Sequence, residues 1–511
     1  MINKMVKNTF AVLSNSLLTS FLGFLLVPIL LASVGTEKYG LIVLTVFFSV
    51  RNGVLGIFIC GIQSAMTKFV AEFTASHEDR KISVLLNSAL VFYFLISSLI
   101  VLFLYSFKVY LLQTVFNVPL EFLDDYLGAF DFVIAAVYFQ FFNLVLLGYL
   151  EGLQQFMTSK LIDTSSYLLY FLSVLALLHF GYGYVEVIKA LSLMHVVTFL
   201  VSLLVFNFKN GKYSFTLSHE RSTQLRFLRY CGALFSGGIA GVLYNQSPKF
   251  FVTTILTPAA LGIYDIVSKV PNLAKTIIGF GNAVVVPVAS ELSTTRGAGS
   301  TDRLFIVGLK LNLLIFVPFI TCLVLLTNNI IEIWVGIDYV QYGYLMQFLF
   351  LVPLLSLFIS HGNSIFLGIN YRMGLFSSFG WIIFSISTLY ILATVDQFGL
   401  FAIASSRSVG LLVIVPVSVA IFLAYFKIPT LPFLARMLCL AILGVVPYSV
   451  AVLIGPIFSD SSLLGLVVEG GVEYLSYALF IYLVVLDSTE KHYVGRVVAL
   501  ISQSVGLGTR T

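Results

Sequence analysis

The stretch from Val84 to Phe107, VLLNSALVFYFLISSLIVLFLYSF, contains no charged residue. A helix needs about 20 mostly apolar residues to cross the hydrocarbon core of a bilayer, and this stretch is longer than that. The strands of a membrane barrel would instead be segments of about 10 residues in which polar and apolar side chains alternate. The stretch therefore predicts a transmembrane helix and favours an α-helical membrane protein.

The composition of the whole chain indicates the same class. Of its 511 residues, 59% are hydrophobic and 10% are charged, and the mean hydropathy is +1.03. Soluble domains carry about 25% charged residues, so this chain lacks the polar surface that a soluble globule needs. The 48 Phe and 26 Tyr residues exclude a disordered chain. The net charge of +5 comes from dispersed basic residues, so no nucleic-acid partner is expected.

About fourteen apolar runs reach the length of a membrane span. They cover residues 9–32, 39–62, 84–107, 127–150, 161–181, 184–206, 231–256, 259–283, 304–327, 343–367, 373–394, 398–425, 432–455 and 462–486. Basic residues concentrate in the cytoplasmic loops of membrane proteins. With a cytoplasmic N-terminus, 18 of the 28 Lys and Arg residues lie on the inner side, 2 lie on the outer side and 8 fall within spans. This asymmetry predicts that both termini are cytoplasmic.

Two segments about 220 residues apart resemble each other. Val34–Ile42 can be laid on Leu256–Tyr264, which matches Gly40 with Gly262. Each segment falls at the turn between the first two spans of a set of six, which predicts a parallel repeat of the kind found in some transporters. The predicted organisation is an N-terminal six-helix lobe (1–206), a basic cytoplasmic linker (207–230), a C-terminal six-helix lobe (231–425), and two additional helices with a cytoplasmic tail (426–511). A cleft between two such lobes is what alternating access requires.

Charged residues within the spans form the candidate site. An ionised side chain at bilayer depth costs about 2.5–3.5 kcal/mol, so it normally faces a cavity or a partner. The candidate substrate-binding cations are Arg51, Lys249, Lys269, Lys275 and Arg407, and the candidate for ion coupling is Asp265. Basic residues outnumber acidic ones within the spans. The pattern predicts a cationic cleft that suits an anionic cargo, such as a phosphate or pyrophosphate head group.

Each of these candidates also has a structural interpretation. Arg51 lies near the middle of its span and is either a cavity residue or a member of a structural ion pair. Asp265 and Lys269 are four residues apart and can pair along one face of a helix. Lys249 follows a proline, which frees backbone groups that cavity water or neighbouring helices must satisfy. Arg407 either lines a cavity or bonds one helix to another.

Other classes of site have no sequence signature here. The four cysteines lie in apolar runs without a CxxC pair, and the six histidines show no metal-ligand spacing. Neither GxxxxGKS nor GxxxxGKT occurs, so ATP hydrolysis by this chain is not expected. No metal and no cofactor are predicted.

The turn Val34–Leu41 and the segments Tyr244–Phe251 and Leu261–Asp265 resemble the polysaccharide-export (Wzx-type) branch of the MOP superfamily. Its other branches include the MATE multidrug exporters and the lipid II flippases. The resemblance implies two six-helix lobes around a central cationic cavity, with alternating access. It also implies flipping of undecaprenyl-pyrophosphate-linked oligosaccharide units to the outer leaflet, driven by a proton or sodium gradient, for O-antigen, lipopolysaccharide, capsule or exopolysaccharide synthesis.

At the level of residues the match to this superfamily is partial. A midspan Arg on span 2 is typical of the related lipid flippases, and Arg51 matches it in place. Phe24 and Leu25 stand where those proteins carry an acidic and a basic residue on span 1. On span 7 an Asp followed by a basic residue is common, and here Pro248 precedes Lys249. The resemblance also implies a bacterial inner-membrane location. Its implied partners are membrane lipids, the lipid-linked oligosaccharide, a polysaccharide polymerase and a chain-length regulator.

Two other functions compete with a flippase. A MATE-like cation-coupled exporter of small molecules is the first, although the excess of basic residues within the spans argues against a cationic cargo. A membrane polysaccharide polymerase or ligase is the second. Such enzymes need a substantial outer loop with catalytic residues, whereas the outer loops predicted here are short and contain no His. A transporter rather than an enzyme is therefore expected.

Overall fold

The computed structural model describes residues 2–209, 220–283, 285–295, 298–369, 383–392, 399–433, 435 and 463–480. This part of the chain is built of helices and contains no β-strand. The predicted tail after residue 486, nearly all of the predicted span 432–455 and part of the span 373–394 lie outside the described residues.

Ten helices in the described ranges are long and apolar enough to cross a membrane. Many of their large apolar side chains are exposed, such as Leu99 and Leu102 on the third helix. Exposed apolar surface of this extent is stable in lipid and not in water. The predicted class of an all-α polytopic membrane protein is confirmed, while the number of about fourteen spans stays a prediction.

The chain divides into two compact units. Unit 1 comprises Met1–Leu273 and Arg372–Ile414, and unit 2 comprises Ala274–Tyr371 and Val415–Thr511. Two helices, α8 (Pro258–Ala283) and α15 (Gly399–Tyr425), contribute residues to both units. The predicted lobe boundaries, the linker and the repeat that relates the lobes stay predictions.

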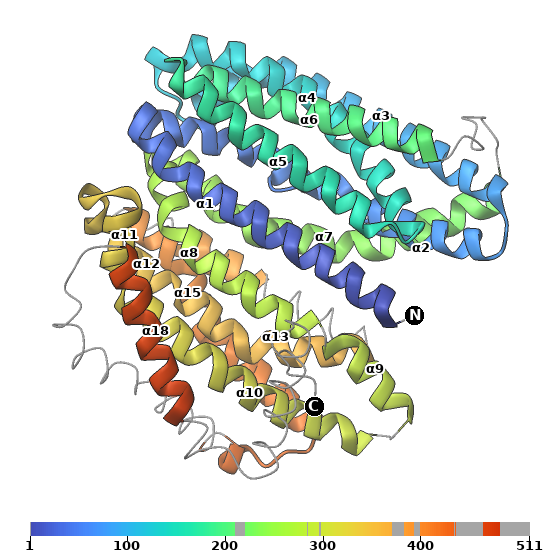
Figure 1. Cartoon of the computed structure of the whole chain (residues 1–511), viewed down its shortest axis with the longest axis vertical. Coiled ribbons are helices and arrows are strands. Elements are labelled where there is room, and N and C mark those ends of the chain that lie inside the picture. Colours follow the sequence, from blue (N-terminus) through green and yellow to red (C-terminus); the bar gives the residue numbers. More distant parts are fainter. Residues whose placement is uncertain are drawn as a thin grey trace, which may run out of the picture. The chain divides into compact units, whose positions relative to one another are not determined.

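Long helices that pack side by side build unit 1 (Figure 1). They are α1 (Ile2–Phe47), α2 (Ile62–Ala75), α3 (Asp79–Tyr110), α4 (Leu120–Gly152), α5 (Phe156–His179), α6 (Tyr184–Lys209), α7 (Arg221–Ile255) and the first parts of α8 and α15, with the short helices η1 (Val54–Ile59) and η2 (Leu111–Val115) between α1 and α4. Helix α4 packs against α2, α3 and α6, and α1 packs against α5. Helix α4 is buried on most sides, which explains why its sequence is apolar around almost its whole circumference.

Close approach of α2 and α4 depends on two glycines of α4. A Cβ atom on Gly152 would lie 2.6 Å from the Cβ of Val70, and one on Gly148 would lie 2.9 Å from the backbone oxygen of Gln63. Small residues four positions apart let two helix backbones approach in this way.

The predicted spans 9–32 and 39–62 are joined differently from the expectation. Helix α1 covers the first span and the beginning of the second, up to Phe47, and within it only Gly35 leaves the helical conformation, with φ 80° and ψ 169°. The second span is not one continuous helix as predicted. It stops at Phe47, is irregular over residues 48–53 and continues through η1 and α2 to Ala75. Average hydropathy does not report such a short break, because the flanking residues remain apolar.

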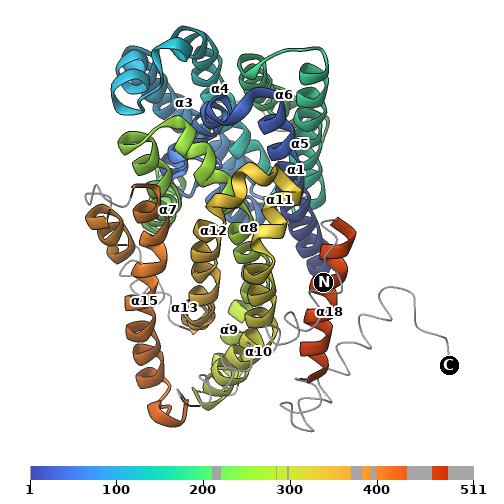
Figure 2. The same ribbon diagram turned by 90° about the vertical axis from the view of Figure 1, so that its left-hand side faces the viewer.

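Unit 2 contains α9 (Val285–Thr295), α10 (Ala298–Leu325), α11 (Thr327–Val335), η3 (Ile337–Tyr342), α12 (Gly343–Leu349), α13 (Leu351–Ile369), α18 (Leu463–Phe480) and the last part of α15. Helix α10 packs on α9, α13 and α18 (Figure 2). His361 of α13 is buried against Gly308 of α10, where a Cβ atom would lie 2.4 Å from its ring. A structural role for this histidine follows from its burial and its contact with the Leu304 carbonyl at 3.3 Å.

Candidate functional site

The break between α1 and η1 exposes backbone groups that a continuous helix would satisfy. Gln140 of α4 supplies one of the missing partners, because its Oε1 accepts the Val50 N–H at 2.9 Å. The Ser49 hydroxyl accepts the Asn52 N–H at 3.3 Å. Irregular backbone at membrane depth is stable only where protein or a cavity satisfies it. Side chains of the protein therefore stabilise this irregular segment, which contains Arg51.

Arg51 forms an ion pair with Asp163 of α5. Its Nη1 lies 2.8 Å from Asp163 Oδ2, and the next residue, Asn52, donates to the Tyr167 hydroxyl at 2.9 Å. The Asp163 side chain is 4% exposed, whereas Arg51 remains 36% exposed. The ion-pair alternative for Arg51 is thus observed, and the guanidinium still presents surface beyond the pair.

Helix α5 begins at Phe156, before the start of the predicted span 161–181, so Asp163 lies about two turns inside the helix. Asp163 and Tyr167 are one turn apart and therefore share the face that meets the break.

A second element of the site is the proline kink of α7. Pro248 has no N–H, so the carbonyl of Tyr244 lacks its usual helical donor. Arg407 of α15 replaces this donor, with Nη2 at 2.6 Å from Tyr244 O and 2.9 Å from Asn245 O. Its guanidinium also lies over the Tyr244 ring, 4.7 Å from the centroid. Arg407 is buried and bonds α15 to α7, so the structure favours the interhelical interpretation over a cargo-binding one.

The kink and the break are in direct contact. Gln246 of α7 donates from Nε2 to the backbone oxygen of Asn52 at 2.9 Å. The segment that follows Arg51 is therefore bonded on one side to α5 and on the other to α7.

Asp265 of α8 is the third element, and it holds two of the predicted cations. Its Oδ1 lies 3.0 Å from Lys249 Nζ, and its Oδ2 lies 3.2 Å from Lys269 Nζ. Tyr39 of α1 donates its hydroxyl to the same carboxylate at 2.8 Å. Asp265 is buried, with 6% of its surface exposed, and all three donors contact its carboxylate. Two cations share one carboxylate here, which leaves one surplus positive charge.

Lys275 lies six residues after Lys269 on α8, in the part of the helix that belongs to unit 2. Its predicted place in a cationic cleft stays a prediction.

The comparisons with known proteins agree with this arrangement of helices. The family model described as polysaccharide biosynthesis protein matches residues 5–293, more than half of the chain. The chain belongs to this polysaccharide biosynthesis family. No curated protein matches the sequence.

Solved structures show the fold of this family member. The lipid II flippase MurJ in an inward closed conformation has a TM-score of 0.70 and 16% identity, covering 93% of this chain and 99% of that one. An inward-facing MATE multidrug transporter has a TM-score of 0.69 and 14% identity, and the match covers 81% of this chain and 94% of the transporter. A third structure is a MOP superfamily transporter from Pyrococcus furiosus, which is described as having a binding pocket of reverse polarity. Its TM-score is 0.55 and its identity 16%, and the match covers 83% of this chain and 95% of that one. At 14–16% identity these structures show that the chain shares their fold.

Sequence reasoning missed several partners in this member of the polysaccharide biosynthesis family. Tyr39, Gln140, Asp163 and Tyr167 each bond to the break or to Asp265. The one signal available was the presence of polar residues at membrane depth, which is weak because a hydroxyl or amide is tolerated on many helix faces.

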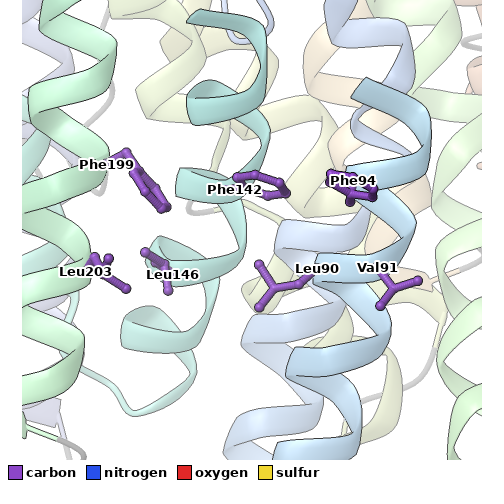
Figure 3. A pocket seen from close by; sticks show the side chains of 7 residues that line it. All are labelled: Leu90, Val91, Phe94, Phe142, Leu146, Phe199 and Leu203. Carbon is purple, nitrogen blue, oxygen red and sulfur yellow. The ribbon is translucent and has the colours of Figure 1, made fainter. Parts of the chain in front are cut away.

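An apolar groove also occurs in unit 1, between α3, α4 and α6 (Figure 3). Its volume is about 360 Å³, and its lining consists of Leu90, Val91, Phe94, Phe142, Leu146, Phe199 and Leu203. These side chains offer no group that binds an ionised cargo. The described residues also contain no cluster of three His, Cys, Asp or Glu side chains that could hold a metal ion.

Proposed function

We propose that this family member flips undecaprenyl-pyrophosphate-linked oligosaccharide units across the bacterial inner membrane by alternating access. The family match and the MurJ-like fold support a lipid-linked cargo. The observation that carries the proposal is Arg51, a partly exposed arginine on a broken helix at membrane depth. Synthesis of O-antigen, capsule or exopolysaccharide would use this step, with a polymerase and a chain-length regulator acting on the product.

In the proposed mechanism the pyrophosphate competes with Asp163 for Arg51. An arginine binds phosphate oxygens in a bidentate manner, and such bonds are stronger where water is excluded. The Lys249–Asp265–Lys269 group contributes its surplus positive charge and favours the dianionic head group over a cation. The sugars and the lipid tail need no ionic contact in this scheme.

Asp265 is the proposed site of coupling to a proton or sodium gradient. A proton or a sodium ion on its carboxylate would weaken its attraction to Lys249 and Lys269. Both lysines would then be available to the cargo, and the bond from Tyr39 would change at the same time. Ion binding and cargo binding are linked in this way through one carboxylate.

The test uses cells whose surface polysaccharide depends on this protein. The variant Arg51→Ala is compared with Arg226→Ala, whose side chain is exposed and forms a different ion pair, with Glu72 at 2.8 Å. Loss of polysaccharide for Arg51→Ala and normal polysaccharide for Arg226→Ala, at equal protein levels in the membrane, is the expected result. Normal polysaccharide in both strains would remove Arg51 from the function.

A MATE-like exporter of small cations is the second candidate, because a MATE transporter matches the fold about as well as MurJ does. The two functions differ in cargo charge. Resistance of cells to cationic drugs on expression of this chain would favour the exporter. Unchanged drug sensitivity together with restored polysaccharide favours the flippase.

A further inference from the structure

Two glycines of unit 1 make a reciprocal contact between α1 and α8. A Cβ atom on Gly40 would lie 1.9 Å from the backbone oxygen of Pro258. A Cβ atom on Gly262 would lie 3.0 Å from the backbone oxygen of Thr36. Pro258 is four residues before Gly262, and Thr36 is four residues before Gly40, so each glycine faces the carbonyl one turn before the other.

This reciprocity agrees with the predicted internal repeat. The offset of 222 residues that places Gly40 on Gly262 also places Thr36 on Pro258. The contact is therefore self-complementary, as it is between the two copies in a twofold-symmetric dimer. At Gly40 only glycine leaves room for the facing backbone oxygen, and at Gly262 any larger residue would be tight against it.

Further contacts lie beside the crossing, at the end of unit 1 that the sequence predicts to be the outer one. Tyr39, next to Gly40, bonds to Asp265, three residues after Gly262. Asn117, between η2 and α4, donates to the Thr253 and Thr254 carbonyls of α7 at 3.3 and 3.0 Å. These bonds also join residues of the first predicted lobe to residues of the second.

We infer that the Gly40–Gly262 crossing is the closed outer gate of the protein and that it separates when cargo is released outward. The inference rests on alternating access as proposed above. Its geometry suits a gate, because each glycine meets a backbone oxygen of the other helix, and Tyr39 is the side chain that packs beside Gly262. Backbone contacts at a glycine crossing are individually weak. The Tyr39–Asp265 bond latches the crossing and links it to the carboxylate proposed for ion coupling.

The experiment measures the distance across the gate without any cargo. Spin labels are placed on cysteines at Leu120 of α4 and Thr257 before α8, both exposed, in a chain whose four native cysteines are replaced by serine. Double electron–electron resonance on the labelled protein in nanodiscs should give one short distance between the two spin labels when the gate is unmutated. Gly40→Ala should add a population at longer distance, because its methyl group would lie 1.9 Å from the Pro258 oxygen. Gly262→Ala should add a smaller one, because its methyl group would lie 3.0 Å from the Thr36 oxygen.

Matched controls come from the same two helices. Gly23→Ala in α1 and Gly279→Ala in α8 have nothing within 4 Å of the added atom, and they should keep the short distance. Equal distance distributions for the gate variants and these controls would overturn the inference. If neither gate variant folds, Tyr39→Phe decides, since it removes only the latch hydroxyl, and an unchanged distance in that variant would also overturn it.

The gate and the proposed function can fail separately. A longer distance in the gate variants, with no flipping of a lipid-linked sugar by the unmutated protein, keeps the gate and rejects the cargo. Flipping by a protein whose gate distance never changes, even during turnover, rejects the gate and keeps the cargo.

Discussion

Arg407 donates from Nη2 to the backbone oxygen of Tyr244 at 2.6 Å, the carbonyl that Pro248 leaves without a helical donor. A cationic side chain thus supplies the hydrogen bond that the neighbouring helix lacks at its proline. The kink it stabilises holds Gln246 against Asn52 and places Lys249 beside Asp265. The positions of Arg51 and Lys249 therefore depend on a residue that need not touch the cargo.

The role of Arg407 predicts a coupling with Pro248. Arg407→Ala leaves the buried Tyr244 carbonyl without a donor and should lower the unfolding free energy by about 1–3 kcal/mol. Pro248→Ala restores an N–H to the helix, so Arg407→Ala should cost less in that background. Thermal unfolding of the two single variants and the double variant measures the coupling. Strictly additive losses would contradict this role.

Asp163 should matter for folding because it neutralises Arg51. Asp163→Asn leaves the arginine without its counter-ion at membrane depth. Breaking a fully buried pair costs about 3–5 kcal/mol, and the loss here should be smaller because Arg51 is partly exposed. The control is Asp131→Asn, whose half-exposed carboxylate pairs with Lys108 and should contribute about 0–1 kcal/mol. Equal thermal stabilities of the two variants would show that the Arg51 pair is not structural.

Asp265→Asn should uncouple transport from the ion gradient. The neutral amide cannot hold Lys249 and Lys269 as the carboxylate does, and it cannot exchange a proton or bind sodium as a carboxylate can. Transport rates in proteoliposomes should therefore stop responding to an imposed pH or sodium gradient. A variant that keeps the gradient response of the unmutated protein would exclude Asp265 as the coupling residue.

The α2–α4 contact predicts that two glycine-to-alanine substitutions in α4 have opposite effects on stability. Gly152→Ala places a methyl group 2.6 Å from the Val70 side chain and should destabilise the protein by about 1–3 kcal/mol through overpacking. Gly128→Ala meets nothing within 4 Å and should stabilise α4 by up to about 1 kcal/mol through helix propensity. Thermal unfolding of both variants checks the signs. Destabilisation by Gly128→Ala as large as that by Gly152→Ala would contradict the packing described.

The fold class could be predicted from sequence because membrane spans depend on composition summed over about 20 residues. The break at residues 48–53 could not be predicted in this way, since it is short and lies between apolar segments. Arg51, Lys249, Asp265 and Lys269 were recognised because an ionised residue at membrane depth is unusual.

The partners of these charges were harder to predict. The pairing of Asp265 with Lys269 follows helical spacing, whereas the Tyr39 contact joins residues 226 positions apart. Asp163 falls at the start of the predicted span 161–181, whereas its helix begins earlier, at Phe156. For Arg407 the sequence left two roles open, and only the location of Tyr244 O distinguishes them.

The most direct test of the central claim is flipping by the purified protein. Liposomes carry the protein and a fluorescent undecaprenyl-pyrophosphate-linked sugar, and a membrane-impermeant quencher reports which leaflet holds the probe. We expect the unmutated protein and Arg226→Ala to flip the probe, and Arg51→Ala to flip it at least about tenfold more slowly, which corresponds to the loss of about 1.4 kcal/mol of binding to the head group. Equal rates for Arg51→Ala and Arg226→Ala, or no flipping by the unmutated protein, would contradict the account.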